Sequence, residues 1–334
     1  MRGAGPARAA VIFGALAVAP LVLSAHWVVN LLIFTVMYAA LASAWNVVGG
    51  YAGYPSLGHA AFFGVGAYAV AIWFSRHDVG SGYRPFLVLP LVGVAVALVG
   101  LPIAWVAMRT RADVFAIVTI TLLFVVQVLA FNLRSLTGGS QGVGINPPPF
   151  PADTYERPFY YAMLVLLAVA VAVSYGILRT KLGLSLAAVR ADEDKARGVG
   201  VRVTGVKLLA FAVSVGIAAM VGGVWAYYIS FVYPQFAIDP LVTIGMVLMT
   251  FLGGKGTLWG PVLGAFILVP AQQYLAYRLG ANQFYLIGYA AIFLVIMLLL
   301  PRGILPSLRE RFRRRPGPAA PAGAAVDADL AAAR

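Results

Sequence analysis

VFAIVTITLLFVVQVLAF (residues 114–131) is an unbroken apolar stretch that contains no charged side chain. A transmembrane α-helix needs roughly 20 consecutive apolar residues, with a range of about 17 to 25, to cross the hydrocarbon core of a bilayer. This stretch meets that requirement. It therefore predicts a helix that crosses a membrane.

Similar apolar stretches occupy most of the 334 residues, of which 62% are hydrophobic and only 10% are charged. Soluble domains carry about 25% charged residues, so the composition predicts an all-α, polytopic transmembrane helical bundle. Breaks rich in glycine, proline or polar residues divide the chain into about ten membrane segments. The predicted segments are residues 9–24, 27–48, 56–75, 86–108, 114–131, 158–178, 207–231, 240–252, 258–277 and 283–300.

Two of these segments admit a second interpretation. The run at residues 9–23 follows Arg2 and Arg8, a pattern that also fits a secretory signal peptide cleaved near Ala25. Cleavage would leave nine spans, whereas a retained helix gives ten. The segment at residues 240–252 is short for a full crossing and also fits a re-entrant helix.

The basic residues predict the orientation of the spans. Arg109, Arg111, the cluster at 179–202 and the arginines at 309–315 fall on one side when ten segments alternate. Cytoplasmic loops carry an excess of lysine and arginine, so this side and both termini are predicted to be cytoplasmic. The predicted organisation is a cytoplasmic N-terminus at 1–8, a transmembrane domain at 9–305 with a cytoplasmic loop at 179–206 and an external loop at 133–157, and a basic, then disordered cytoplasmic tail at 306–334.

The polar residues argue against several functions. The net charge of +13 follows the loop bias, so membrane lipid and not nucleic acid is the expected partner. All 11 carboxylates lie in loops, tails or at helix ends, which leaves the bilayer interior essentially without ionisable groups. Such groups at depth usually mark proton relays or catalysis, so we expect no catalytic residue and no enzymatic activity. The chain has no cysteine and three histidines, so we expect neither a metal site nor a cofactor.

Two glycine-rich breaks are candidates for a translocation pathway. They are YAGYPSLGHAAFFGVGAYAV (51–70) and FLGGKGTLWGPVLGAF (251–266). Small residues allow close helix packing in lipid, which is one interpretation. Discontinuous helices whose backbone groups line a cavity are the other, since many transporters bind substrate in this way. On that interpretation, the pathway residues are Gly58, His59, Gly253, Gly254 and Gly256.

The loop RTKLGLSLAAVRADEDKARGVGVRVTGVK (179–207) is the longest charged stretch between predicted spans. Residues 184–197 are predicted to form one helix, ended by Gly198 and Gly200. Its small and apolar positions, Leu184, Ala187, Ala188 and Ala191, follow a three-to-four spacing. The loop is either a docking element for a partner protein or a solvated connector.

Several stretches, in order along the chain, resemble the membrane permeases of the branched-chain amino acid ABC importers. They are SLGHAAFFGVGAY (56–68), FAIVTITLLF (115–124), LTGGSQGV (136–143), AVRADEDKARGVGV (188–201), KLLAFAVS (207–214), GGKGTLWGPVLGA (253–265) and PRGIL (301–305). The resemblance implies a bacterial inner-membrane importer with a second homologous permease subunit, two cytoplasmic ATPase subunits and an external solute-binding protein. GGKGT at 253–257 lacks the spacing of a phosphate-binding loop, so nucleotide would bind the ATPase chains.

The resemblance also implies that residues 188–201 couple the permease to its ATPase. The implied coupling residues are Ala188, Arg190, Asp192, Glu193, Ala196, Gly198 and Gly200, although the chain departs from the family pattern at Ala191, Arg197 and Gly198. Similar permeases handle leucine-type amino acids, other amino acids, short amides and urea, so the substrate stays open. A secondary transporter or channel for small polar solutes is the other open reading.

Overall fold

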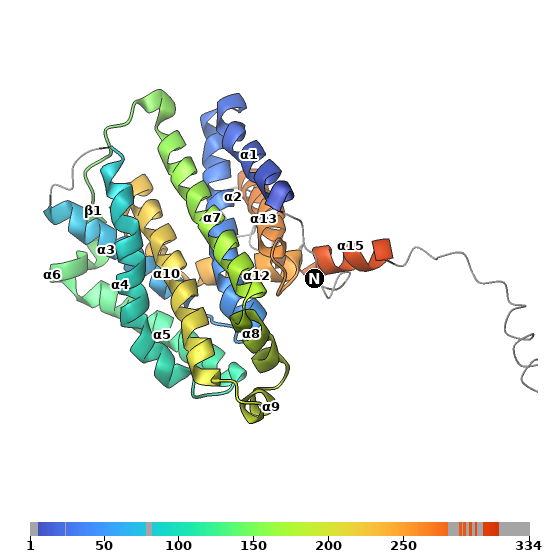
Figure 1. The fold of residues 1–334 in the computed structure, drawn as a ribbon. Helices are drawn as coiled ribbons and strands as arrows, with labels where there is room; N and C mark the ends of the chain where they lie inside the picture. Colours follow the sequence, from blue (N-terminus) through green and yellow to red (C-terminus); the bar gives the residue numbers. More distant parts are fainter. Residues whose placement is uncertain are drawn as a thin grey trace, which may run out of the picture.

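The computed structural model describes residues 6–23, 25–77, 82–279 and 303–313, with isolated positions between 287 and 298. These residues form a bundle of α-helices (Figure 1). The predicted last span at 283–300, the extreme N-terminus and the tail after residue 313 lie wholly or largely outside the described residues. The longer helices are α1 (Pro6–Val22), α2 (His26–Asn46), α3 (His59–Arg76), α4 (Arg84–Ala107), α5 (Ala112–Asn132), α7 (Glu156–Arg179), α8 (Lys181–Ala191), α10 (Val203–Ile229), α12 (Pro240–Gly253), α13 (Gly260–Leu279) and α15 (Ile304–Arg313).

The all-α, polytopic architecture is confirmed. In the described part of the chain, 6 helical segments are long and apolar enough to cross a bilayer, so the predicted count of ten spans is not confirmed. Helix α3 begins with His59, ends with Arg76 and contains glycines, and α13 carries glutamines and Arg278, so both helices are less apolar than the six segments. The six segments are His26–Ala52, Arg84–Ala107, Ala112–Asn132, Ala152–Arg179, Val203–Ile229 and Pro234–Gly253.

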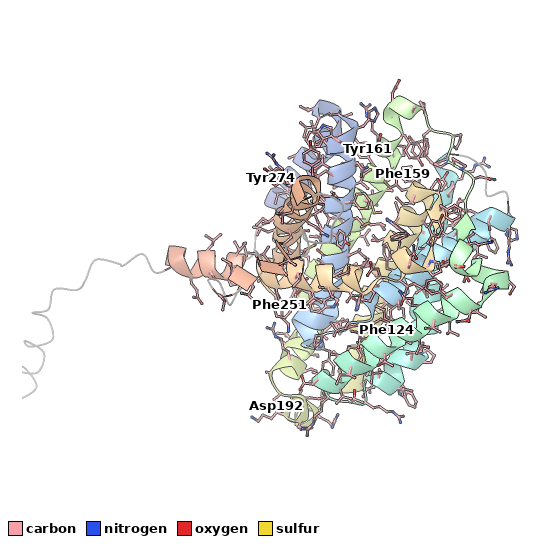
Figure 2. The ribbon with its side chains drawn as sticks, turned by 180° about the vertical axis from the view of Figure 1, so that it is seen from behind. Phe124, Phe159, Tyr161, Asp192, Phe251 and Tyr274 are labelled. Carbon is pink, nitrogen blue, oxygen red and sulfur yellow. The ribbon has the colours of Figure 1, made fainter. Side chains whose placement is uncertain are left out.

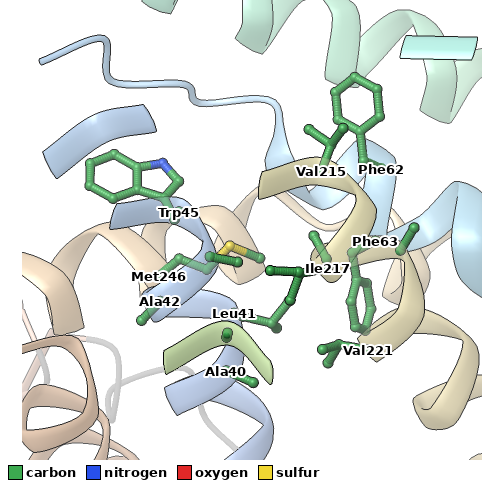
Figure 3. Packing of buried hydrophobic residues seen from close by; sticks show 14 of the residues in the cluster. Ala40, Leu41, Ala42, Trp45, Phe62, Phe63, Val215, Ile217, Val221 and Met246 are labelled. Carbon is green, nitrogen blue, oxygen red and sulfur yellow. The ribbon is translucent and has the colours of Figure 1, made fainter. Parts of the chain in front are cut away.

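Helices α2, α3 and α10 form the interior of the bundle. Glycines set the close approach of α3 to α10: a Cβ added to Gly66 would lie 2.2 Å from the carbonyl oxygen of Ala219, and one added to Gly222 would lie 2.0 Å from that of Phe63. Because apolar burial gives no preference for helix contacts in lipid, such close backbone packing holds helices together. Figure 3 shows the same interior, where Leu41 of α2 lies among Met246 and Ile217.

Helix α4 lies at the periphery and presents a continuous apolar surface. Leu87, Leu91 and Leu98 are exposed on it, and after Arg84 at its first position the helix contains no charged residue. A helix in water would not leave such a surface uncovered. The surface of α4 is therefore suited to lipid.

The segment predicted as an external loop, residues 133–157, is more ordered than expected. It contains the short helix α6 (Arg134–Thr137) and the strand β1 (Val143–Gly144), which pairs antiparallel with β2 (Phe231–Val232). The Tyr155 hydroxyl also donates a hydrogen bond to the carbonyl of Tyr228, at 3.0 Å. Backbone groups of residues 143–145 are thus paired with residues 230–232 just after α10, which the sequence pattern alone does not show.

Candidate functional site

The helical loop between α7 and α10 lies at the end of the bundle. Figure 2 places Asp192 of this loop at the opposite end of the molecule from Tyr161, which lies near the start of α7. The loop contains two helices, α8 and α9 (Glu193–Gly198), so the predicted single helix over residues 184–197 is wrong. All seven predicted coupling residues lie in or directly beside these two helices.

Asp192 causes the interruption. Its backbone is extended, with φ −165° and ψ 114°, and its side chain accepts a hydrogen bond from the backbone N–H of Lys195 at 3.0 Å. This is an N-cap, in which a short carboxylate side chain competes with continued helix. The backbone hydrogen bond from Lys195 also holds the pKa of the Asp192 carboxyl below its usual value.

Gly200 ends α9. Its N–H bonds to the carbonyl of Arg197 at 3.0 Å, while the N–H of Val201 bonds to that of Ala196 at 3.1 Å. This pair of bonds is a Schellman motif, which requires a left-handed residue at the position of Gly200. Gly200 has φ +86°, whereas Gly198 has an ordinary helical backbone.

The predicted stripe of small and apolar residues on α8 faces away from the bundle. Leu184 is 74% exposed, and Ala187 and Ala191 are exposed beside it, with Ala188 half-buried. The opposite side of α8, at Leu186 and Val189, is buried instead. Helix α8 thus has one side attached to the bundle and a second, partly apolar side left open.

Arg190 attaches α8 to two other parts of the chain. Its Nη1 atom donates a hydrogen bond to the carbonyl of Gly50 at 2.8 Å. Gly50 belongs to a π-helical turn, Val47–Ala52, that continues α2. The same guanidinium lies against Gly256, where an added Cβ would be 2.4 Å from Nη1. A predicted coupling residue and a predicted pathway residue are therefore in contact.

Asn46 holds the turn between α12 and α13. Its Nδ2 donates to the carbonyl of Thr257 and its Oδ1 accepts from the N–H of Gly256, both at 2.9 Å. Gly254 and Gly256 have φ values of +124° and +78°, so this turn needs residues without a Cβ. Gly253 packs on Gly260. A Cβ added to Gly253 would lie 1.7 Å from the carbonyl oxygen of Gly260. The break in the chain at 253–257 is thus a built turn.

A second attachment surrounds Lys207, near the start of α10. Its Nζ lies 3.0 Å from Oε1 of Glu193, 2.9 Å from the carbonyl oxygen of Met108 and 3.1 Å from the hydroxyl of Tyr54. Tyr54 in turn donates a hydrogen bond to the other carboxylate oxygen of Glu193. We call these four residues the Lys207 cluster. It joins α9 to the end of α4, the start of α10 and the loop before α3.

The Lys207 cluster holds an ion pair at the ends of the helices, so it does not contradict the expectation that the bilayer interior is essentially free of ionisable groups. Lys207 is only 1% exposed, and its charge is matched by a carboxylate that is 27% exposed. Burial opposes ionisation of Glu193, but the hydrogen bonds from Tyr54 and Lys207 outweigh it, so the pKa of this carboxyl lies below its usual value. Glu193 is therefore ionised near neutral pH.

Gly58 and His59 contact other elements than the α12–α13 turn. A Cβ on Gly58 would lie 2.4 Å from the carbonyl oxygen of Thr119 in α5. His59 is fully buried, and its Nε2 lies 2.7 Å from the hydroxyl of Ser214, which donates to the carbonyl of Ala44. Ser214 uses its proton there, so His59 is the donor in their hydrogen bond. Its Nδ1 has no hydrogen-bond partner among the described residues.

Sequence reasoning did not single out Asn46, Tyr54 or Lys207 as functional residues. The sequence does mark two of them, because Asn46 and Lys207 are polar residues at the ends of long apolar runs. Polar groups at such positions usually have a specific partner. Asn46 is 211 residues from its partner Thr257, and Lys207 is 14 residues from its partner Glu193. No local sequence pattern reveals either pair.

These features define the class of the protein. It is a multi-pass, all-α membrane protein in which the described part buries no Asp or Glu and attaches a helical loop, α8–α9, to the ends of its spans. Residues 27–301 match the family model described as "Branched-chain amino acid transport system / permease component". The chain belongs to this permease family.

Individual relatives agree with the family match. LivM of Salmonella typhimurium, a high-affinity branched-chain amino acid transport system permease protein, is 29% identical over 320 residues, covering 87% of this chain and 73% of the relative. LivM of Escherichia coli is 28% identical over 338 residues, covering 90% and 77%. LsrC of Yersinia enterocolitica, an autoinducer 2 import system permease protein, is 30% identical over 152 residues, covering 42% and 40%. No solved structure matches the chain.

Proposed function

We propose that this chain is the permease subunit of an ABC importer that carries branched-chain or related amino acids across the bacterial inner membrane. Similarity to the LivM proteins extends along most of the chain, whereas similarity to LsrC covers less than half of it. This difference supports an amino acid substrate. An external binding protein delivers the substrate, and a second homologous permease completes the pathway.

In this proposal, two cytoplasmic ATPase subunits supply the energy and contact α8–α9. One observation carries this assignment: α8 leaves the stripe of Leu184, Ala187 and Ala191 open while Arg190 and Glu193 fix the two helices to the bundle. A solvated connector needs neither the open apolar stripe nor the internal attachment. A helix that transmits force needs both, because it must bind a partner and pass its movement on.

Five of the seven proposed coupling residues divide into two roles. Three residues face the bundle and transmit movement. Ala196 is buried, and Arg190 and Glu193 form hydrogen bonds with other helices of the bundle. Asp192 and Gly200 set the start and end of α9. Ala188 and Gly198 complete the set on the outer side, where Gly198 is exposed.

The proposed pathway includes Gly58, His59, Gly253, Gly254 and Gly256, which separate when the bundle opens. Nδ1 of His59 has no partner in the described part of the chain, which supports its place in this set, because a buried polar atom without a partner is costly unless another state satisfies it. The contact between Arg190 and Gly256 supports the link between pathway and ATPase. The chain crosses the membrane ten times in this proposal, with both termini cytoplasmic.

The experiment replaces Leu184 by aspartate and reconstitutes the variant with the ATPases, the second permease and the binding protein. We expect ATPase co-purification and substrate uptake to fall at least tenfold, while the unfolding temperature stays unchanged. Asp153→Asn is the matched control, since Asp153 is exposed just before the other end of α7. Normal uptake and normal ATPase binding by Leu184→Asp would refute the docking role.

A second arm tests the class of transporter and the orientation. Vesicles that contain only this chain should not move amino acids, and uptake without ATPases would instead identify a secondary transporter or channel. The chain has no cysteine, so single cysteines report orientation directly. A cysteine at Asp153 should react with an impermeant reagent from outside only, and one at Ala187 from inside only.

A further inference from the structure

Helix α15 leaves the bundle beside the α12–α13 turn. Gly303 has φ +84° and packs on Gly254. A Cβ added to Gly303 would lie 2.6 Å from the Cα atom of Gly254. The ring of Pro306 also lies against Gly254, and Ile304 packs on the hydrophobic core. Figure 1 shows α15 extending sideways from this anchor, crosswise to α2 and α7. A helix that lies across the spans runs along the membrane plane.

The sequence of α15, ILPSLRERFR, is strongly divided between an apolar and a basic side. At about 100° of rotation per residue, the apolar residues of a helix with this sequence fall within one arc of about 100°. Arg309 and Arg311 fall within about 40° of its two edges. Leu308, within that arc, is 44% exposed, so the bundle covers the stripe only in part. The arc consists of Ile304, Leu305, Leu308 and Phe312.

We propose that α15 lies in the membrane interface and binds anionic phospholipid headgroups. Helices with this division of residues place the apolar side at the boundary between headgroups and acyl chains. Arginines at the edges of the apolar stripe extend toward the headgroups, and a polybasic sequence is attracted to an anionic surface. Arg313, Arg314 and Arg315 continue the basic character directly after the stripe, and Glu310 is the one acidic residue of the helix.

The lipid-bound helix has a mechanical role. Because Gly303 and Pro306 press on Gly254, α15 fixes the α12–α13 turn at the level of the membrane surface. Residues 304–313 lie outside the 27–301 region matched by the family model. The inference rests on the multi-pass architecture and not on transport, so its test needs no uptake measurement.

The test uses the full chain in nanodiscs of phosphatidylcholine with or without phosphatidylglycerol. Spin labels on single cysteines at Leu308 and Ser307 report immersion through their accessibility to oxygen and to a polar nickel reagent. We expect the label at Leu308 to be immersed in discs with phosphatidylglycerol, and the label at Ser307 to stay in the polar phase. An arginine near an anionic surface is worth roughly a fivefold change in binding. The pair Arg309→Gln and Arg311→Gln should therefore lower the ratio of immersed to non-immersed label roughly 30-fold.

Arg202→Gln is the control, because Arg202 is exposed in the α9–α10 connection and should not change immersion. If the double variant does not fold, raising the salt concentration on the unaltered chain supplies the same test, since screening weakens headgroup binding. Equal immersion with and without phosphatidylglycerol would overturn the proposal. So would a label at Leu308 that is water-exposed in both discs and becomes immobile only when the ATPases are added, which would make α15 a protein-docking helix.

Discussion

The Nζ atom of Lys207 lies 3.0 Å from Oε1 of Glu193, and this ion pair joins α10 to α9. The two partners differ in their access to water, because Lys207 is 1% exposed and Glu193 is 27% exposed. An isolated charge is costly when water cannot reach it. The lysine therefore depends on the pair more than the glutamate does.

The first prediction follows from this asymmetry. Glu193→Gln should lower the free energy of unfolding by about 3 kcal/mol, because it leaves Lys207 buried without its carboxylate. This is the low end of the cost of breaking a buried ion pair, because Lys207 keeps its hydrogen bond to the carbonyl of Met108. Lys207→Met should cost about 1 kcal/mol, because Glu193 keeps Arg197 at 3.2 Å and partial contact with water. Thermal unfolding of the purified variants in detergent measures both. The double variant should recover part of the loss, and a Lys207→Met variant less stable than Glu193→Gln would contradict the asymmetry.

The second prediction concerns pH. The folded protein holds the pKa of Glu193 below its usual value. The carboxylate therefore stabilises the fold fully at pH values above the usual pKa, and this contribution is lost as pH falls through the lower pKa of the folded state. The difference in unfolding temperature between the unaltered chain and Glu193→Gln should thus be constant near neutral pH and shrink below about pH 4. A difference that grows on acidification would mean that Glu193 is protonated in the fold.

Gly200 supplies a third prediction, with a matched control two residues away. Gly200→Val should cost at least about 1–2 kcal/mol, because a side chain at φ +86° is strained even though the space around it is open. Gly198→Ala should be neutral or stabilising by about 0.5–1 kcal/mol, since Gly198 is helical and has open space. The readouts are the unfolding temperature and the ratio of substrate uptake to ATP hydrolysis. Equal effects of the two substitutions would argue against the Schellman motif.

The fourth prediction concerns Asn46. Asn46→Ala removes both bonds to the α12–α13 turn and leaves the N–H of Gly256 and the carbonyl of Thr257 unsatisfied, at a cost of about 2 kcal/mol. Asn132→Ala is the control, because Asn132 is exposed and, among the described residues, its amide bonds within its own helix. The α12–α13 turn should also become open to proteolysis in Asn46→Ala alone. Equal stability of the two variants would show that Asn46 does not hold the turn.

The sequence predicts the architecture well because length and apolarity are local properties. The segment at 114–131 shows this, since α5 spans Ala112–Asn132. It predicts α8–α9 less well, because Asp192 can either continue a helix or cap the next one, and a helical pattern of small residues does not distinguish the two. For α3 it leaves close packing and a pathway role open, and the structure shows close packing of Gly66 on the α10 backbone and of Gly64 on Ala237.

The contacts of Asn46 also have a consequence for biosynthesis. Asn46 and Thr257 are 211 residues apart, so the amide finds its partners only after the ribosome has delivered the last part of the bundle. Until then, a nascent chain holds an unsatisfied amide at the end of an inserted helix, and the attachment of Arg190 lacks Gly256 as a neighbour. Truncated or stalled chains that end before Gly256 therefore lack both of these partners of the amide, which a completed chain supplies.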